Sequence, residues 1–260
     1  MTSYASVVVE SDLLQLDREF DFVVPGELEN LVKVGQRVKF QLGRTKKLAT
    51  GFITNLPKSS AFATSELSEI VDLEPVLQLE ILQLARLVAN RQAVALGEIL
   101  QQAVVEHMPR ISKPAITENA LVTPELPVIP GVTNFTDRQA VLTSARSITF
   151  NGLRYPDWCW LFANAASKSL KSGKSAIFVL PERDQIAQLS ELFMAIGFGE
   201  FTSTWLPGAK KSERFTKFHE VLAREHSIVI GSRSAIFAPA NNLGLIAMFD
   251  DGDDSLREQG

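Results

Sequence analysis

The stretches FDFVVPG at residues 20–26, GQRVKFQL at 35–42 and ATGFITNL at 49–56 decide the fold of the first part of the chain. They are short, rich in β-branched and aromatic residues, and separated by glycine and proline, which is typical of strands joined by turns. Together with YASVVVE at residues 4–10 they predict a small antiparallel sheet or barrel. From residue 76 to 107 apolar residues recur at helical spacing, so two helices are expected to pack on this β unit.

The second part of the chain alternates between helical and strand patterns. Helices are expected at residues 136–145, 158–171, 182–196 and 212–225, and apolar strands at 175–180, 201–206, 227–231 and 243–249. This alternation is typical of a parallel sheet covered on both faces, so the fold class is α/β. Five prolines between residues 109 and 130 predict a linker. The expected domains are residues 1–108 and 135–260, joined by a linker at 109–134.

Composition excludes several classes of protein. The chain has 260 residues, of which 45% are hydrophobic and 22% charged, so it can bury a core and is not disordered. It contains neither an apolar run long enough to cross a membrane nor a secretory signal pattern. Its single cysteine, Cys159, reads as a core residue, and no spacing of cysteine and histidine predicts a zinc site. We therefore expect a cytoplasmic protein.

Charge is unevenly distributed although the net charge is only −4. Between residues 33 and 58 there are seven basic residues and no acidic one: Lys33, Arg37, Lys39, Arg44, Lys46, Lys47 and Lys58. They interleave with Phe40 and Phe52, a composition typical of surfaces that follow a phosphate backbone and stack bases. A solvated face of a sheet could show similar lysines, so the pattern favours nucleic-acid binding without excluding that alternative.

Acidic residues gather at the other end, at Asp250, Asp251, Asp253 and Asp254. They follow an apolar strand, where many α/β enzymes hold a magnesium ion, and a solvated acidic loop is the alternative. No spacing suggests a Ser/His/Asp or Cys/His arrangement, so no catalytic residue is assigned.

The segment LDREFDFVVP at residues 16–25, with VGQRV at 34–38, Gly43-Arg44 and Gly51, resembles the opening of the PriA (primosomal protein N′) family of replication-restart helicases. LGEIL at residues 96–100, SER at 212–214 and IVIGSRSAIFAP at 228–239 extend the resemblance over nearly the whole chain. The resemblance implies that the first domain captures the 3′ end of a nascent DNA strand. On matching positions, Phe20 and Asp21 would line the pocket for the terminal nucleotide, and Gly43 would allow close backbone approach.

Residues expected to bind DNA are therefore Phe20, Asp21, Arg37, Lys39, Gly43, Arg44, Lys46 and Lys47. The family places a further pocket lysine near Ser65, and this sequence lacks it.

The resemblance also implies that the second domain is a partial RecA-like helicase lobe, with a degenerate nucleotide site. The family's phosphate-binding segment, GVTGSGKT, falls on NGLRYPDW at residues 151–158, which has neither the lysine nor the hydroxyl that the phosphates and magnesium require. The family's acidic motif falls on residues 249–252, so Phe249 replaces the metal-holding aspartate. Only Asp250 and Asp251 remain as candidates for nucleotide binding, and the pattern resembles the actinobacterial branch of the family, which is thought to lack helicase activity.

The resulting hypothesis is a DNA-binding replication restart protein of the primosome that recognises stalled forks and 3′ ends without helicase activity. An ATP-dependent 3′-to-5′ helicase with an atypical nucleotide site and a scaffold that does not bind DNA are the alternatives. Expected partners are forked and single-stranded DNA and other primosome proteins, with no membrane. The family uses ATP, magnesium and zinc, whereas no cofactor or metal is expected in this chain, which reads as a truncated or partial sequence.

Overall fold

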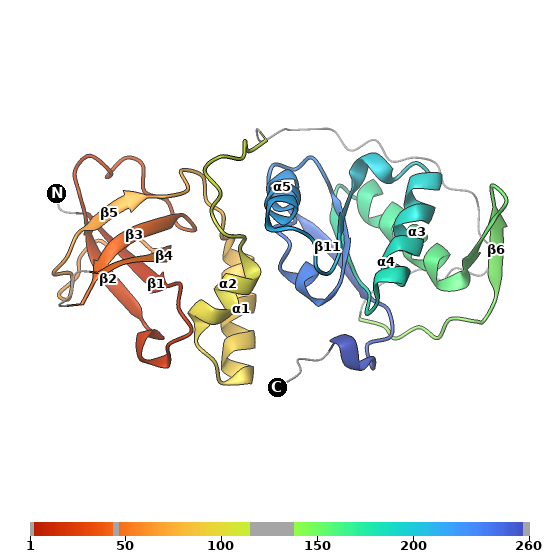
Figure 1. Cartoon of the computed structure of the whole chain (residues 1–260), viewed down its shortest axis with the longest axis horizontal. Coiled ribbons are helices and arrows are strands. Elements are labelled where there is room, and N and C mark those ends of the chain that lie inside the picture. Colours follow the sequence, from red (N-terminus) through yellow and green to blue (C-terminus); the bar gives the residue numbers. More distant parts are fainter. Residues whose placement is uncertain (1–2, 44–46, 115–137, 257–260) are drawn as a thin grey trace. The chain divides into compact units, whose positions relative to one another are not determined.

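The computed structural model describes residues 3–43, 47–114 and 138–256 of the chain. It divides into two compact units, Met1–Pro109 and Arg110–Gly260, here called unit 1 and unit 2 (Figure 1). Each unit has its own core, and each is described by itself. The expected α/β class is confirmed, with a curled antiparallel sheet in unit 1 and a parallel sheet in unit 2.

Unit 1 is built on an antiparallel sheet with the strand order β2-β1-β4-β3-β5. Its strands are β1 (Ser3–Val9), β2 (Glu19–Val24), β3 (Arg37–Leu42), β4 (Lys47–Asn55) and β5 (Leu67–Ile70). The sheet curls until its two edges meet, where Val23 of β2 bridges to Glu66 just before β5. The Val23 N–H also donates to the carbonyl of Ser65 at 2.9 Å. The expected barrel-like form is therefore present as a partly closed sheet.

Alternate side chains of these strands fill the inside of the curled sheet. Val7, Phe22, Phe40 and Ile53 belong to this core, and the rings of Phe22 and Phe40 are 4.5 Å apart between centroids. Alternation in a strand sends neighbouring residues to opposite faces, so Ser6, Val8 and Phe52 lie on the outer face. Burial of the inner apolar side chains is what holds the sheet in its curled form.

Two helices complete unit 1, as the helical spacing predicts: α1 (Leu79–Gln92) and α2 (Leu96–Ala103). The start of α2 is held by Asp17, whose Oδ1 accepts the N–H of Leu96 at 2.9 Å. Gly97 lets the helix pass very close to the end of β1, because a Cβ there would lie 2.2 Å from the carbonyl oxygen of Val9. The chain between β1 and β2 forms a short 3-10 helix, η1 (Leu14–Leu16).

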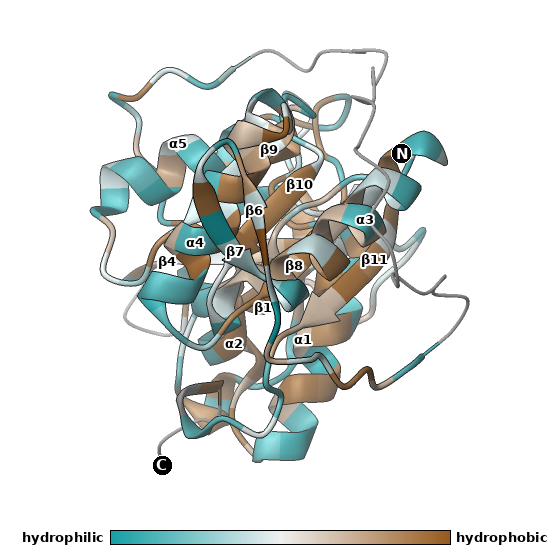
Figure 2. Cartoon of the chain, turned by 90° about the vertical axis from the view of Figure 1, so that its right-hand side faces the viewer, coloured by the Kyte–Doolittle hydropathy of each residue, from teal (hydrophilic) through white to brown (hydrophobic). Residues whose placement is uncertain are grey.

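Unit 2 contains the expected parallel sheet, with the strand order β11-β8-β10-β9. Its strands are β8 (Ser175–Val179), β9 (Thr202–Trp205), β10 (Ile228–Gly231) and β11 (Leu243–Met248), and its helices are α3 (Asp157–Lys171), α4 (Arg183–Ala195) and α5 (Lys211–Leu222). Ala176 and Phe178 pack with α3 and α4, whereas Ile177 and Val179 pack with Val221 of α5. The apolar strands β8 and β10 are brown in Figure 2.

Two features of unit 2 differ from the sequence expectation. Residues 138–145 form no helix, and Thr136 and Asp137 lie outside the described residues. Residues 138–145 are all exposed, so a helix there would bury no apolar face to offset its nucleation cost. An antiparallel hairpin of β6 (Ser147–Phe150) and β7 (Leu153–Pro156) precedes α3 instead.

Cys159 is a core residue as expected, fully buried in α3. Burial raises the pKa of its thiol, which keeps the group protonated and unreactive. Within the described part of the chain, no helix combines the length and apolarity that a bilayer crossing needs.

Candidate nucleic-acid interface

Asp21 is held in one orientation by two serine hydroxyls. It lies on β2 opposite Ser6 of β1, and the Ser6 hydroxyl donates to Oδ1 at 2.7 Å. The hydroxyl of Ser60, in the loop between β4 and β5, donates to Oδ2 at 2.6 Å. An ionised carboxylate accepts about four hydrogen bonds, so both oxygens keep a free lone pair. The Asp21 carboxylate is therefore held in place, is half-exposed, and can accept a hydrogen bond from a ligand donor such as a hydroxyl group.

Phe20 lies next to Asp21 in sequence but on the opposite face of β2. It pairs with Val7 and packs against the core inside the sheet, half-buried. The guanidinium of Arg18 lies over its ring at 4.7 Å from the centroid. The strand therefore separates the two residues that the resemblance places in one pocket, and a base could reach the covered ring face only by displacing Arg18.

The loop between β4 and β5 borders the Asp21 site. Besides donating to Asp21, the Ser60 hydroxyl accepts the N–H of Phe62 at 3.1 Å. Ser65, near which the family places a lysine, lies beside β2 because its carbonyl accepts the N–H of Val23. The neighbouring Phe62 is 83% exposed. Sequence spacing gave no signal for Ser6, Ser60 or Phe62, because their proximity to Asp21 arises from the curl of the sheet.

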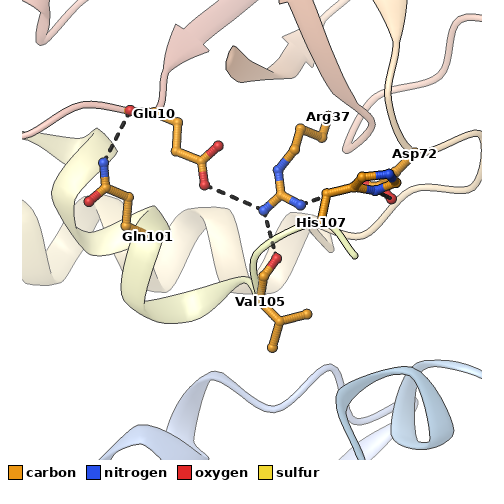
Figure 3. Close-up of polar contacts among 6 residues, drawn as sticks. All are labelled: Glu10, Arg37, Asp72, Gln101, Val105 and His107. Atoms are coloured by element: carbon orange, nitrogen blue, oxygen red, sulfur yellow. Dashed lines mark hydrogen bonds and ion pairs between the residues drawn. The ribbon is translucent and has the colours of Figure 1, made fainter. Parts of the chain in front are cut away.

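Arg37 is buried in unit 1, with only 3% of its surface exposed. Its guanidinium pairs with Asp72 at 3.2 Å and with Glu10 at 3.4 Å, and it donates to the carbonyl of Val105 at 2.8 Å (Figure 3). Asp72 also contacts Nδ1 of His107 at 2.8 Å. We call these five residues the Arg37 cluster. Because its charge is neutralised and enclosed, Arg37 is left out of the interface proposed below.

The other basic residues of the stretch are distributed differently. Lys39 pairs with Glu69 of β5 at 3.0 Å, and Lys33 pairs with Glu74 at 3.2 Å. The acidic partners come from β5 and the chain after it. Although residues 33–58 contain no acidic residue, the fold brings acidic side chains next to some of their lysines. Lys47 is exposed at the start of β4.

Gly43 directly follows β3 and has a φ of +69°. Its surroundings are open, because a Cβ at this position would meet no atom within 4 Å. Its positive φ fits glycine, and its surroundings leave the backbone accessible. Arg44 and Lys46 lie outside the described residues.

A cavity of about 490 Å³ lies beside the outer face of β2, between η1 and the helices of unit 1. Its lining includes Arg18, Glu19 and Arg86, and Glu19 forms an ion pair with Arg86. Glu19 and Asp21 are two residues apart on β2 and therefore share a face of the strand. This face thus carries two carboxylates, with guanidinium groups at the border of the cavity.

In unit 2, the positions that resemble the family's phosphate-binding segment, 151–158, form the turn of the β6–β7 hairpin, strand β7 and the start of α3. Asn151 and Gly152 make its turn, with φ values of +49° and +80°. Two positive φ angles are characteristic of a type I′ hairpin turn, which Asn-Gly favours. A phosphate-binding loop follows a strand of the parallel sheet, whereas this segment follows β6 of a separate antiparallel hairpin.

The ring of Phe249 packs on Trp158 of α3, with 4.4 Å between centroids. An aromatic pair therefore occupies the positions where the family would place phosphate and metal ligands. Asp250 and Asp251 are exposed after β11, and Asp250 has a positive φ of +48°. Among the described residues, no group of three or more His, Cys, Asp or Glu side chains could hold a metal ion.

Comparison with known proteins identifies unit 1. Residues 6–105 match the family model of the PriA 3′ DNA-binding domain. This match assigns this part of the chain to the class of 3′ DNA-binding domains. Taken with the relatives described next, this match makes the chain similar to the PriA family of replication restart proteins over nearly its whole length.

The similarity continues into unit 2. The chain is 28% identical over 258 residues to the probable replication restart protein PriA of Mycobacterium leprae, covering 94% of this chain and 39% of the relative. It is 29% identical to the protein of that name from Mycobacterium tuberculosis, over 94% of this chain and 38% of the relative. The replication restart protein PriA of Treponema pallidum is 28% identical over 93% of this chain and 38% of its own length. The chain thus spans about two fifths of the length of these relatives.

Proposed function

We propose that this chain is a DNA-binding replication restart protein that recognises stalled forks by their free 3′ ends and does not act as a helicase. The observation that carries the proposal is Asp21, a carboxylate fixed by two serine hydroxyls within a 3′ DNA-binding domain. A free 3′-hydroxyl donates one hydrogen bond to this acceptor. A hydrogen bond to a charged acceptor is about twice as strong as one between neutral groups.

The same site disfavours a 3′-phosphate. Asp21 has two serine hydroxyls as its hydrogen-bond partners, and its negative charge repels a terminal phosphate. The internal phosphates of the strand are held elsewhere, by the exposed Lys47 and by Arg44 and Lys46, which precede it in the sequence. Charge of this kind contributes affinity without sequence preference.

Unit 2 is, in this proposal, a degenerate RecA-like lobe. Its parallel sheet supports that assignment, while the Asn151-Gly152 turn and the Phe249–Trp158 pair replace the groups that would bind ATP and magnesium. Without those groups nothing neutralises the charge that develops on a transferred phosphoryl group. Unit 2 then serves to contact other proteins of the primosome rather than to move along DNA.

The test compares a fork whose leading strand ends in a 3′-hydroxyl with the same fork ending in a 3′-phosphate. The wild-type chain is expected to prefer the hydroxyl end, and Asp21→Asn to lose that preference, because the amide carries no charge to repel phosphate. Asp12→Asn is the matched control, since Asp12 is an exposed carboxylate of the same unit. Affinities are measured by fluorescence anisotropy. Equal affinity of the wild type for both ends would show that end recognition is absent.

A further inference from the structure

We infer that Phe62, in the loop between β4 and β5, provides the aromatic face on which the terminal base of the DNA strand stacks. This inference rests on the proposed function, because it concerns the nucleotide whose 3′-hydroxyl binds Asp21. Phe62 has no part in the sequence motifs described above. Its exposure of 83% makes it stand out in unit 1, where Phe22, Phe40 and Phe52 are buried and Tyr4 and Phe20 are partly buried.

Two hydrogen bonds in series connect Phe62 to the acceptor for the 3′-hydroxyl. The Phe62 N–H donates to the hydroxyl of Ser60 at 3.1 Å, and that hydroxyl donates to Asp21 Oδ2 at 2.6 Å. A few residues further on, the carbonyl of Ser65 accepts the N–H of Val23 on β2 at 2.9 Å. The segment that carries Phe62 is thus fixed at both ends beside Asp21. Ser60 is a positioning residue, since it holds the carboxylate and the aromatic residue together.

The aromatic residue next to Asp21 in sequence is less suited to this contact. Phe20 lies on the other face of β2, packs against the core of the sheet and has the Arg18 guanidinium over its ring. Phe22 is 4% exposed and belongs to that core. Tyr4 of β1 shares the outer face with Ser6 and is half-buried, which makes it the rival candidate in the test.

The ligand class follows from the chemistry of a phenyl ring beside a carboxylate. Every nucleobase has a π face, so stacking on Phe62 accepts any terminal base. Asp21 reads the 3′-hydroxyl of the same nucleotide, and the exposed Lys58 precedes the Ser60 turn in the same loop. The site therefore recognises a 3′-terminal nucleotide of any sequence.

The experiment uses the full chain and two forks with a free 3′-hydroxyl. One ends in 2-aminopurine, whose fluorescence is quenched by stacking, and the other ends in an abasic sugar. The Phe62→Ala variant is expected to weaken binding to the first fork about tenfold and to reduce the quenching, because stacking contributes roughly a factor of ten or more per base. Binding to the abasic fork is expected to stay unchanged, since no base is there to stack.

Matched variants separate the explanations. Phe62→Trp retains an aromatic face and is expected to keep both affinity and quenching. Leu87→Ala removes a comparably exposed apolar side chain, on α1, and is expected to change neither. If Phe62→Ala weakens both forks equally or neither, or if Tyr4→Ala abolishes the quenching instead, the inference is wrong.

The result also distinguishes this inference from the proposed function. A wild type that prefers a 3′-hydroxyl over a 3′-phosphate, combined with a Phe62→Ala variant that behaves like it, overturns the role of Phe62 and leaves end recognition in place. A wild type without that preference overturns the proposed function, and absence of quenching in the same protein overturns the stacking as well.

Discussion

At the scale of single residues, burial distinguishes an arginine and a lysine that look alike in the sequence. Arg37 and Lys39 are two residues apart on β3, and both fit a phosphate-binding stretch. The side chain of Arg37 is 4% exposed and pairs with carboxylates that are 1% and 15% exposed, whereas the ion pair of Lys39 is largely open to water. A buried charge without its partner is costly, and an exposed one is not.

Replacing Arg37 with alanine is therefore expected to destabilise unit 1 strongly. The change leaves Asp72 and Glu10 without their guanidinium, and breaking a buried pair costs about 3–5 kcal/mol. The matched variant Lys39→Ala should cost less than about 1 kcal/mol, because its pair with Glu69 is exposed. All three tryptophans lie in unit 2, so hydrogen exchange of the β1 and β3 amides is the suitable measurement. Similar protection in the two variants would contradict the structural role given to Arg37.

At the scale of elements, β4 begins with the exposed Lys47. If this end of the hairpin follows the phosphates, Lys47→Gln should weaken binding to all DNA sequences alike. The slope of log affinity against log salt should become shallower by about 0.7 for a contact to single-stranded DNA. Lys171→Gln, an exposed lysine of α3, is the control and should leave the slope unchanged. A slope unaffected by Lys47→Gln would make this lysine part of a solvated face.

Most elements could be predicted from the sequence because their residues carry a clear period. The strands β1 to β4 alternate or are β-branched, and the helices of unit 2 repeat their apolar residues at helical spacing. The short strand β5 gave no such signal, since two of its four residues are exposed polar ones. It depends on pairing with β3, which is a tertiary effect.

The β6–β7 hairpin was missed for a different reason. Asn151-Gly152 between apolar residues is a strong hairpin signal, but the same residues also fall on the family's phosphate-binding segment. The candidate site could also be predicted from the sequence only in part. Asp21 could be predicted from its motif, whereas Ser6 and Ser60 could not, because the closure of the sheet brings them to Asp21 from distant positions in the chain.

At the scale of the whole molecule, the two units carry different parts of the family's resemblance. Unit 1 contains the residues that match the 3′ DNA-binding domain, and its acceptor site is complete in the described structure. Unit 2 has the expected parallel sheet, but residues 138–145 form no helix, and a hairpin and an aromatic pair lie at the positions that resemble the family's nucleotide site. The match to a 3′ DNA-binding domain and the hairpin with the aromatic pair therefore lie in different units.

We expect no DNA-stimulated ATP hydrolysis by the full chain. The groups that would neutralise the transferred phosphoryl are absent at 151–158, and Phe249 stands where a metal ligand would be. Release of inorganic phosphate is measured with and without single-stranded DNA, and the Asp250→Asn variant serves as the comparison. A rate that rises with DNA in the wild type and disappears in Asp250→Asn would contradict this expectation.

The Arg37 cluster also has a mechanical consequence. The chain leaves α2 at Ala103 and is fastened to the sheet shortly afterwards, by the bond from Arg37 to the Val105 carbonyl and by the contact of His107 with Asp72. A pull applied to the chain beyond His107 loads these two attachments before it reaches the last turn of α2. Tension along the polypeptide is therefore borne by the rigid sheet, and the helices that cover the DNA-binding unit stay in place under load.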